Sequence, residues 1–274
     1  MNMINYNGHW IRKSAAFLTA NNRAFKYGDA LFETLKVEHL KVHFIDDHYF
    51  RLMASMRMLR MKIPMHFTIE FLESEILKTI KKNKKDSARI RLTVYRDSDG
   101  LYAPANNEIA YLIEVSSLDV QIKDNYTIDL FKDYFIYSGL LSSIKTTNKI
   151  TNVLAGIYAS ENGLDNCVLL NERKHIAEAI NGNIFLVKGN IIKTPAITEG
   201  CIRGVIRKQI IEIVSKNEKY ELVETEISPF EIQQSDEVFI TNAIIGIQPV
   251  SNYKKKSFSD KVAKELAIAL KSLI

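Results

Sequence analysis

Short stretches in which apolar and polar residues alternate recur along the chain. Residues 30–37, 89–96 and 109–115 are the clearest cases, and their two-residue period predicts β-strands with one face against a core. Shorter runs predict further strands at 42–45, 128–137, 167–170 and 237–241, and a hairpin of 184–187 with 191–192 around Gly189 and Asn190.

Between these strands, apolar residues recur at helical spacing. A helix is expected after Asp46, which would cap it, and Pro64 should stop it, while a second helix should cover 68–82. Further helices are expected at 151–161 and 204–214, and a closing helix should carry Phe258, Val262, Leu266 and Leu270 on one face.

Interspersed helices and strands predict a mixed α/β (α+β) protein. Residues 118–126 are polar and lose periodicity, which is typical of a linker. We therefore expect two lobes: an N-terminal α/β domain over 1–118, a linker over 119–126, and a C-terminal α/β domain over 127–274.

Composition narrows the class of protein. The 274 residues are 46% hydrophobic and 25% charged, with a net charge of +5, which is ordinary for a folded globular protein. The absence of a long apolar run and of an apolar leader predicts no membrane association. Cys167 and Cys201 form no disulfide framework, so we expect a cytoplasmic protein with reduced thiols.

The mild positive net charge is compatible with an anionic small ligand and with weak nucleic-acid contact, and it does not distinguish between these partners. The lysine-rich run 81–85 lacks interleaved aromatic residues and is typical of a solvated helix end, so no nucleic-acid partner is expected. The common phosphate-loop, dinucleotide, zinc-protease and serine-hydrolase motifs are absent. His39, His43 and His48 cluster too loosely to predict a metal site.

A few positions nevertheless suggest chemistry. Lys145 lies in a loop just before a predicted helix, whose positive end would lower the amine pKa, and a neutral amine is a nucleophile. Most lysines in loops are simply solvated, so the spacing alone does not show whether Lys145 is catalytic. Arg51 lies in a helix that faces the core, so its side chain either stays at the surface or reaches inward to bind an anion. Gly200 and Gly204 lead into a helix whose first amides can hold a phosphate.

Taken together, these segments resemble one family, the class IV aminotransferases, which are fold-type IV enzymes that use pyridoxal 5′-phosphate. The resemblance runs in order from Arg23 to Val250. It rests on the segments YGDALFET, FIDDHYFRL, IKTTN, EAINGNIFLV, TPAITEGCIRGVIR and EVFITNAIIGIQPV.

The resemblance implies a two-lobed fold, a homodimer and roles for particular residues. Lys145 would form the Schiff base with the cofactor and then act as general acid and base. Glu178 would pair with the pyridine nitrogen. The cofactor phosphate would be held by Arg51 and by the backbone amides of Val205, Ile206, Asn242 and Ala243.

Departures from the family pattern bear on the substrate. Many transaminases of the family carry threonine where this chain has Ile206, whereas the chorismate-derived lyases accept an apolar residue. In the other direction, Gly100 replaces an arginine found in many lyases. Gly100 and Tyr102 also replace the R-x-H of the D-amino acid enzymes, so D-amino acids are not expected. The substrate-binding candidates are Tyr27, Lys36 and Arg91, the last two for a carboxylate.

We therefore expect an enzyme that takes an amino acid or aminodeoxychorismate as its substrate. The favoured reaction is that of 4-amino-4-deoxychorismate lyase, which releases pyruvate and 4-aminobenzoate for folate synthesis. A branched-chain or related amino acid aminotransferase is the alternative. A cofactor-binding protein without catalysis is a third hypothesis, and the retention of Lys145, Glu178 and Arg51 together speaks against it.

Overall fold

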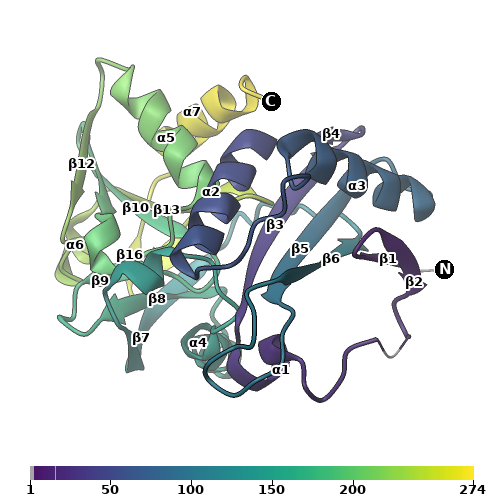
Figure 1. The fold of residues 1–274 in the computed structure, drawn as a ribbon. Helices are drawn as coiled ribbons and strands as arrows, with labels where there is room; N and C mark the ends of the chain where they lie inside the picture. Colours follow the sequence, from purple (N-terminus) through teal and green to yellow (C-terminus); the bar gives the residue numbers. More distant parts are fainter. Residues whose placement is uncertain (1–2, 16) are drawn as a thin grey trace. The chain divides into compact units, whose positions relative to one another are not determined.

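The computed structural model describes residues 3–15 and 17–274, which form two compact units. The first unit comprises the chain up to Asp119 together with Lys145–Asn148. The second unit comprises Val120–Ile144 and Lys149–Ile274. In Figure 1 the first unit is coloured purple to blue, and most of the second is green to yellow.

A six-stranded antiparallel sheet forms the body of the first unit, in the order β2-β1-β6-β5-β3-β4. Helices α2 and α3 cover one face of this sheet (Figure 1). The buried positions of the long strands alternate, as in Leu31, Leu35 and Val37, because only one face of the sheet meets the helices. The elements are β1 (Met3–Tyr6), β2 (His9–Arg12), α1 (Arg23–Tyr27), β3 (Ala30–Glu38), β4 (Lys41–Val42), α2 (Ile45–Met58), α3 (Ile69–Lys82), β5 (Ala88–Arg96) and β6 (Ile109–Ser116).

Two sheets and their flanking helices form the second unit, with strand orders β12-β11-β10-β13-β14 and β16-β15-β7-β8-β9. A shared apolar core lies between the sheets, while α4 packs on the outer side of β7 and β8 and α5 and α7 pack on β13. The elements are β7 (Thr127–Ile136), η1 (Leu140–Ser143), α4 (Ile150–Glu161), β8 (Asn166–Asn171), β9 (Ile176–Ala179), β10 (Asn183–Lys188), β11 (Ile191–Pro195), η2 (Ile197–Glu199), α5 (Val205–Ser215), β12 (Glu221–Thr225), α6 (Phe230–Gln234), β13 (Glu237–Asn242), β14 (Gly246–Pro249), β15 (Asn252–Tyr253), β16 (Lys256–Ser257) and α7 (Lys261–Lys271).

Strand β8 shows why its sequence has no alternation. Val168 and Leu170 face the core between the sheets, whereas Cys167 and Leu169 pack under α4. A strand that is buried on both faces is apolar at every position.

The ends of several helices differ from the prediction. Helix α2 begins at Ile45 after Phe44, which adopts a left-handed conformation (φ 51°), so Asp46 lies in the first turn and is not the cap. A carboxylate there still favours the helix, because it faces the positive end of the dipole. Helix α2 also ends at Met58, well before Pro64. Phe258 precedes α7 and packs on the core from the loop.

The segment Lys145–Asn148 was expected in the C-terminal domain, and in the structure its contacts are with the first unit. The reason is backbone pairing with the start of β3. Phe32 N–H donates to the Lys145 carbonyl (2.9 Å), and Thr147 N–H donates to the Ala30 carbonyl (3.0 Å). Backbone hydrogen bonds of this kind require a partner strand, which the local sequence does not reveal.

Among residues 3–15 and 17–274, no helix has the length and apolar character needed to cross a membrane.

Candidate active site

The predicted catalytic lysine lies on the sheet of the first unit. Its Nζ is 4.4 Å from the centroid of the Phe32 ring. The residues that follow it are tied to one turn, because Thr147 Oγ1 and Asn148 Nδ2 both donate to the Gly28 carbonyl (3.1 Å each). Gly28 has φ 62°, and a Cβ there would lie 2.2 Å from Asn148 Oδ1, so only glycine fits. The backbone around Lys145 is therefore fixed by close packing.

Arg91, one of the predicted substrate-binding residues, lies at the same aromatic ring. Its guanidinium carbon is 4.0 Å from the Phe32 centroid. Burial lowers the pKa of Arg91, and the neighbouring Glu114 opposes this effect. Cations favour the face of an aromatic ring, and Lys145 and Arg91 both contact that of Phe32. Such a pair of cations can attract a substrate carboxylate.

Lys36 lies farther along β3. It points to the same face as Phe32 because four residues separate them, which also puts it roughly 13 Å away along the strand. Its ammonium pairs with Glu38 at 3.0 Å. Of the two predicted carboxylate-binding cations, only Arg91 is brought to the ring that Lys145 contacts.

Arg51 reaches inward from α2 to a buried carboxylate. Its Nε donates to Glu33 Oε1 (2.8 Å), and one terminal nitrogen donates to Glu33 Oε2. His48 Nδ1 lies 2.7 Å from the same Oε2. Burial alone would raise the pKa of Glu33, but the Arg51 charge and the His48 hydrogen bond lower it to about 2.

The pKa of His48 is lowered by burial, although Glu33 opposes the effect. A neutral His48 that donates Nδ1–H to an ionised Glu33 fits both shifts. Glu33 and His48 were not among the predicted site residues. A signal was nevertheless present, because Glu33 occupies a position of the 30–37 alternation that is otherwise apolar.

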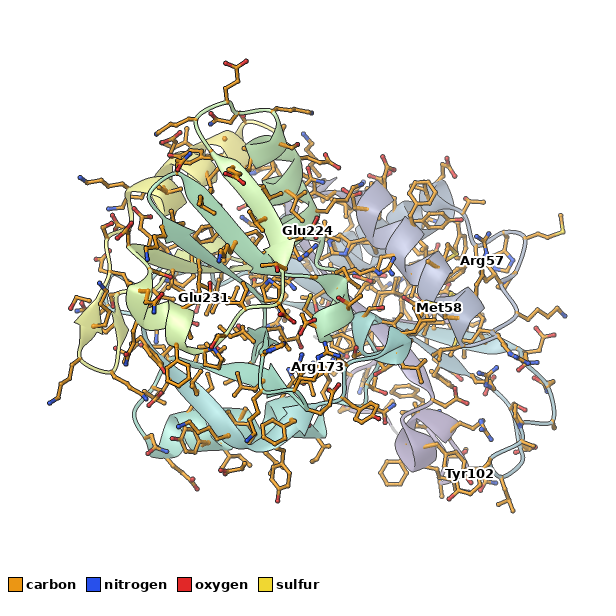
Figure 2. All side chains as sticks on the ribbon, turned by 90° about the vertical axis from the view of Figure 1, so that its left-hand side faces the viewer. Arg57, Met58, Tyr102, Arg173, Glu224 and Glu231 are labelled. Atoms are coloured by element: carbon orange, nitrogen blue, oxygen red, sulfur yellow. The ribbon has the colours of Figure 1, made fainter. Side chains whose placement is uncertain are left out.

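Tyr27 is linked to the loop that follows β5. Its ring lies 5.5 Å from that of Tyr102 and 5.0 Å from the Arg23 guanidinium. Figure 2 shows Tyr102 beside the short helix α1. Arg23 is 4% exposed and donates to the carbonyls of Gly100 (3.2 Å), Leu101 (2.6 Å) and Tyr102 (3.3 Å). These bonds hold the loop against the turn that carries Tyr27.

Asp29 connects this anchor to the strand. Its Oδ2 accepts from the Nε atoms of both Arg23 (2.8 Å) and Arg96 (2.9 Å). Arg23, Asp29 and Arg96 were not predicted as functional residues, since their meeting depends on how β5 and α1 pack.

In the second unit, Glu178 and Asn183 organise the loop before α5. Glu178, at 4% exposure, accepts a hydrogen bond from the Ile202 amide (2.9 Å). Asn183 Nδ2 donates to the Ile202 carbonyl (2.8 Å). A Cβ on Gly204 would lie 2.0 Å from Asn183 Oδ1, so glycine is required for this close approach. The structure thus brings Glu178 to the loop that starts α5.

The N-terminus of α5 carries amides that suit an anion. Gly204 provides no side-chain cap, and the first hydrogen bond of the helix runs from the Lys208 amide to the Gly204 carbonyl (3.0 Å). Within the described chain, the amides of Val205 and Ile206 therefore precede the helical ladder without a capping partner. Such amides bind phosphates.

A polar group at the end of β13 adds to this region. Thr241 pairs with Asn183 in the strand ladder, and its Oγ1 is buried without a partner in the part of the chain that the structure describes. The side chain of Asn242 closes its own turn by accepting from the Ile244 and Ile245 amides (3.0 Å each). An orphaned buried hydroxyl beside a helix N-terminus fits a phosphate group, because phosphate oxygens accept from both kinds of donor.

The comparisons with known proteins identify the family. The family model for amino-transferase class IV matches residues 30–253. The chain belongs to the class IV aminotransferases. This is a family of enzymes that use pyridoxal 5′-phosphate.

Relatives in this family carry different activities. A Methanocaldococcus jannaschii protein, provisionally named a branched-chain-amino-acid aminotransferase, is 27% identical over 97% of this chain and 92% of its own length. The aminodeoxychorismate lyase of Vibrio harveyi is 25% identical, covering 84% of this chain and 85% of its own. The branched-chain aminotransferase structure from Escherichia coli shares the fold, with a TM-score of 0.89 at 22% identity, covering 99% of this chain and 94% of the other.

A separate group of side chains in the second unit has the residue types of a metal site. His175, Glu199 and Glu226 bring their ligand atoms within 4.8 Å of one another. However, Arg173 already pairs with Glu199 at 2.8 Å, and Asn171 donates to the same carboxylate (2.8 Å). Arg173 and Asn171 satisfy the buried carboxylate of Glu199 without a metal ion, so these contacts form an ion-pair network.

Proposed function

We propose that this class IV enzyme is a 4-amino-4-deoxychorismate lyase, which releases pyruvate and 4-aminobenzoate in folate synthesis. The observation that carries the proposal is the meeting of Lys145 and Arg91 at the Phe32 ring. It supports a proton-transferring amine and a carboxylate-binding cation that contact one aromatic ring. The apolar side chain of Ile206, which supplies no hydroxyl for a phosphate, supports the lyase over a transaminase.

The cofactor roles belong to the same proposal. When bound, pyridoxal 5′-phosphate supplies an electron-withdrawing ring for the carbon next to the substrate nitrogen. Lys145 Nζ takes a proton and returns it to the departing carbon fragment. Glu178, whose carboxylate accepts from the Ile202 amide, would accept a hydrogen bond from the ring nitrogen and keep that nitrogen protonated.

We assign the binding of the cofactor phosphate to the backbone amides of Val205, Ile206, Asn242 and Ala243 and to the side chain of Arg51. The α5 terminus supports this assignment because its first amides lack a capping partner among the described residues. The two hydrogen bonds from Arg51 to Glu33 support the assignment as well, because they hold the guanidinium in one orientation. Tyr27, next to the anchored loop, is assigned to the substrate side.

The experiment combines spectroscopy with product analysis. Wild type and Lys145→Ala are incubated with pyridoxal 5′-phosphate, and Lys149→Ala serves as the matched control from the same loop. We expect a visible absorbance band in wild type and Lys149→Ala, and its loss in Lys145→Ala. Aminodeoxychorismate should then yield pyruvate, measured with lactate dehydrogenase, and 4-aminobenzoate, measured by chromatography.

A branched-chain aminotransferase is the second candidate, and the M. jannaschii relative favours it. In that case leucine would bleach the band, 2-oxoglutarate would restore it, and aminodeoxychorismate would give no product. A band without turnover of either substrate would point to a non-catalytic binding protein. Absence of any band would contradict the cofactor roles assigned above.

The proposal also includes a homodimer in the cytoplasm. Exposed apolar side chains crowd one stretch of the second unit and support an interface there, because large exposed apolar patches mark contact sites. Light scattering after size exclusion should give about twice the 31.4 kDa of one chain. The stretch includes Tyr134, Phe135, Tyr137, Leu140 and Leu141.

A further inference from the structure

A cavity of about 390 Å³ lies in the first unit beside the first half of α3. It lies between this helix, the turn joining β1 to β2, and the start of β6. Tyr111 lines it and points to the helix-covered face of the sheet, whereas Arg91 points to the opposite face. The cavity is therefore separate from the predicted catalytic lysine, and its size falls within the range of small-molecule sites.

Aromatic rings form much of its wall. The rings of Phe67 and Phe71 lie 5.7 Å and 6.0 Å from that of Tyr111, and Phe71 meets Tyr111 at 89°. His66 stands edge-on to Phe71 at 4.9 Å. Ring faces of this kind attract cations and the apolar groups attached to them.

One carboxylate, that of Glu75, lines the same cavity. Its Oε2 accepts from Asn5 Nδ2 (2.8 Å), and its Oε1 pairs with the exposed ammonium of Lys78 (2.9 Å). An ionised carboxylate offers about four acceptor sites, so these two bonds leave capacity for another donor. The negative charge excludes an anionic ligand. A single carboxylate among aromatic rings also lacks the several oxygen ligands that a bare metal ion requires.

The hydroxyl of Tyr111 is a second polar group of the cavity. Tyr111 is 7% exposed and lines the cavity, and a Cβ built on Gly8, another lining residue, would lie 3.6 Å from its hydroxyl. Burial, assisted by the charge of Glu75, raises the pKa of Tyr111, so it stays a neutral phenol that can accept from an N–H. A hydroxyl and a carboxylate that line one cavity can both accept from the N–H of a bound cation.

We propose that this cavity binds a small organic ammonium ion with an apolar body. The N–H group faces Glu75 and Tyr111 Oη, and the apolar body packs against Phe67 and Phe71. The site is independent of the proposed lyase activity and of the cofactor, because it lies on the other face of the sheet.

The test uses the cofactor-loaded enzyme and N,N-dimethylbenzylammonium as the probe. A tertiary ammonium has one N–H and cannot condense with an aldehyde, so it reports on this site without reacting with the cofactor. Benzyl methyl ether is the neutral control of similar shape. Binding of each is measured by saturation-transfer NMR titration to wild type, Glu75→Gln, Tyr111→Phe and the exposed α3 control Glu70→Gln.

We expect saturable binding of the ammonium to wild type and Glu70→Gln. Its Kd should rise about tenfold in Glu75→Gln, which corresponds to about 1.4 kcal/mol, and severalfold in Tyr111→Phe. The ether should bind far more weakly. Absence of saturable binding, equal binding of the ether, or an unchanged Kd in both variants would overturn the proposal. If Glu75→Gln does not fold, the binding of the ether and the Kd of Tyr111→Phe still test the proposal.

Discussion

Replacing Glu33 by glutamine removes the negative charge from the buried cluster of Glu33, His48 and Arg51 while keeping the size of the side chain. In the wild type, the carboxylate accepts from Arg51 Nε at 2.8 Å and lies 2.7 Å from His48 Nδ1. In Glu33→Gln, the amide nitrogen would face these donors with further N–H groups. Arg51 would also lose its anionic partner.

The expected magnitude follows from the pKa of Glu33. It falls from 4.5 to about 2 in the folded protein. At about 1.36 kcal/mol per pKa unit, the ionised form is stabilised by about 3 kcal/mol. Removing one partner of a buried ion pair costs about 3–5 kcal/mol, because the remaining charge is left uncompensated. We therefore expect Glu33→Gln to lower the free energy of unfolding by at least about 3 kcal/mol at pH 7.

The pH dependence provides a second check. Because the folded pKa lies below the unfolded value, the contribution of Glu33 is fully present above about pH 4.5. It is lost as the pH falls from 4.5 towards 2, where the folded carboxyl also binds a proton. The difference between wild type and Glu33→Gln should therefore shrink over this interval.

Urea unfolding followed by far-UV circular dichroism measures both quantities. Glu38→Gln is the matched control, because Glu38 ends the same strand but is partly exposed in its pairs with Lys36 (3.0 Å) and His43 (3.3 Å). We expect it to cost less than about 1 kcal/mol. A loss in Glu33→Gln no larger than that of Glu38→Gln would refute the buried ionised cluster.

Other features lead to further predictions. Gly204→Ala places a Cβ 2.0 Å from Asn183 Oδ1, so it should displace the α5 terminus and weaken pyridoxal 5′-phosphate binding about tenfold in a spectral titration. Asp29→Asn removes the carboxylate shared by two arginines, so chymotrypsin should cut the loop after β5 faster, at Leu101 and Tyr102, as mapped by mass spectrometry. Burial raises the pKa of Cys167 to about 11 and of Cys201 to about 12, so iodoacetamide at pH 8 should leave both unlabelled in the folded protein.

Controls sharpen each of these predictions. Gly139→Ala should leave cofactor binding unchanged, because a Cβ there has no neighbour within 4 Å. Asp119→Asn, at an exposed position, should leave the cleavage rate unchanged. Both cysteines should react in urea. Tight cofactor binding by Gly204→Ala, unaltered cleavage of Asp29→Asn, or rapid alkylation of the folded protein would each contradict the corresponding contact.

Much of the local structure follows from the sequence. The two-residue alternation at 30–37, 89–96 and 109–115 predicted strands that the structure places at Ala30–Glu38, Ala88–Arg96 and Ile109–Ser116. The predicted hairpin around Gly189 is also present. The short strands β1, β2, β9, β12, β14, β15 and β16 were not predicted. A strand of so few residues shows too little alternation, and it forms because a neighbouring strand offers backbone partners.

The family could likewise be identified from the sequence, because its motifs combine glycines at close approaches with the polar residues they serve. Gly28 and Gly204 illustrate this, since a side chain at either would collide with Asn148 or Asn183. Each of these glycines and asparagines lies within a short motif, so it leaves a readable pattern even where its partner lies far along the chain, as Asn148 does from Gly28. The catalytic candidate Lys145 and the cofactor-binding candidate Glu178 lie within motifs of the same kind.

The tertiary structure alone decided which side chains meet. The alternation in β3 determines that Glu33 points to the helix side and Phe32 to the other, but it does not show that Arg51 would reach the first or Lys145 the second. The cavity that Tyr111 and Glu75 line together is also invisible in the sequence. The physical reason is that periodicity sets the direction of a side chain, whereas its partner depends on the packing of elements that are distant in the chain.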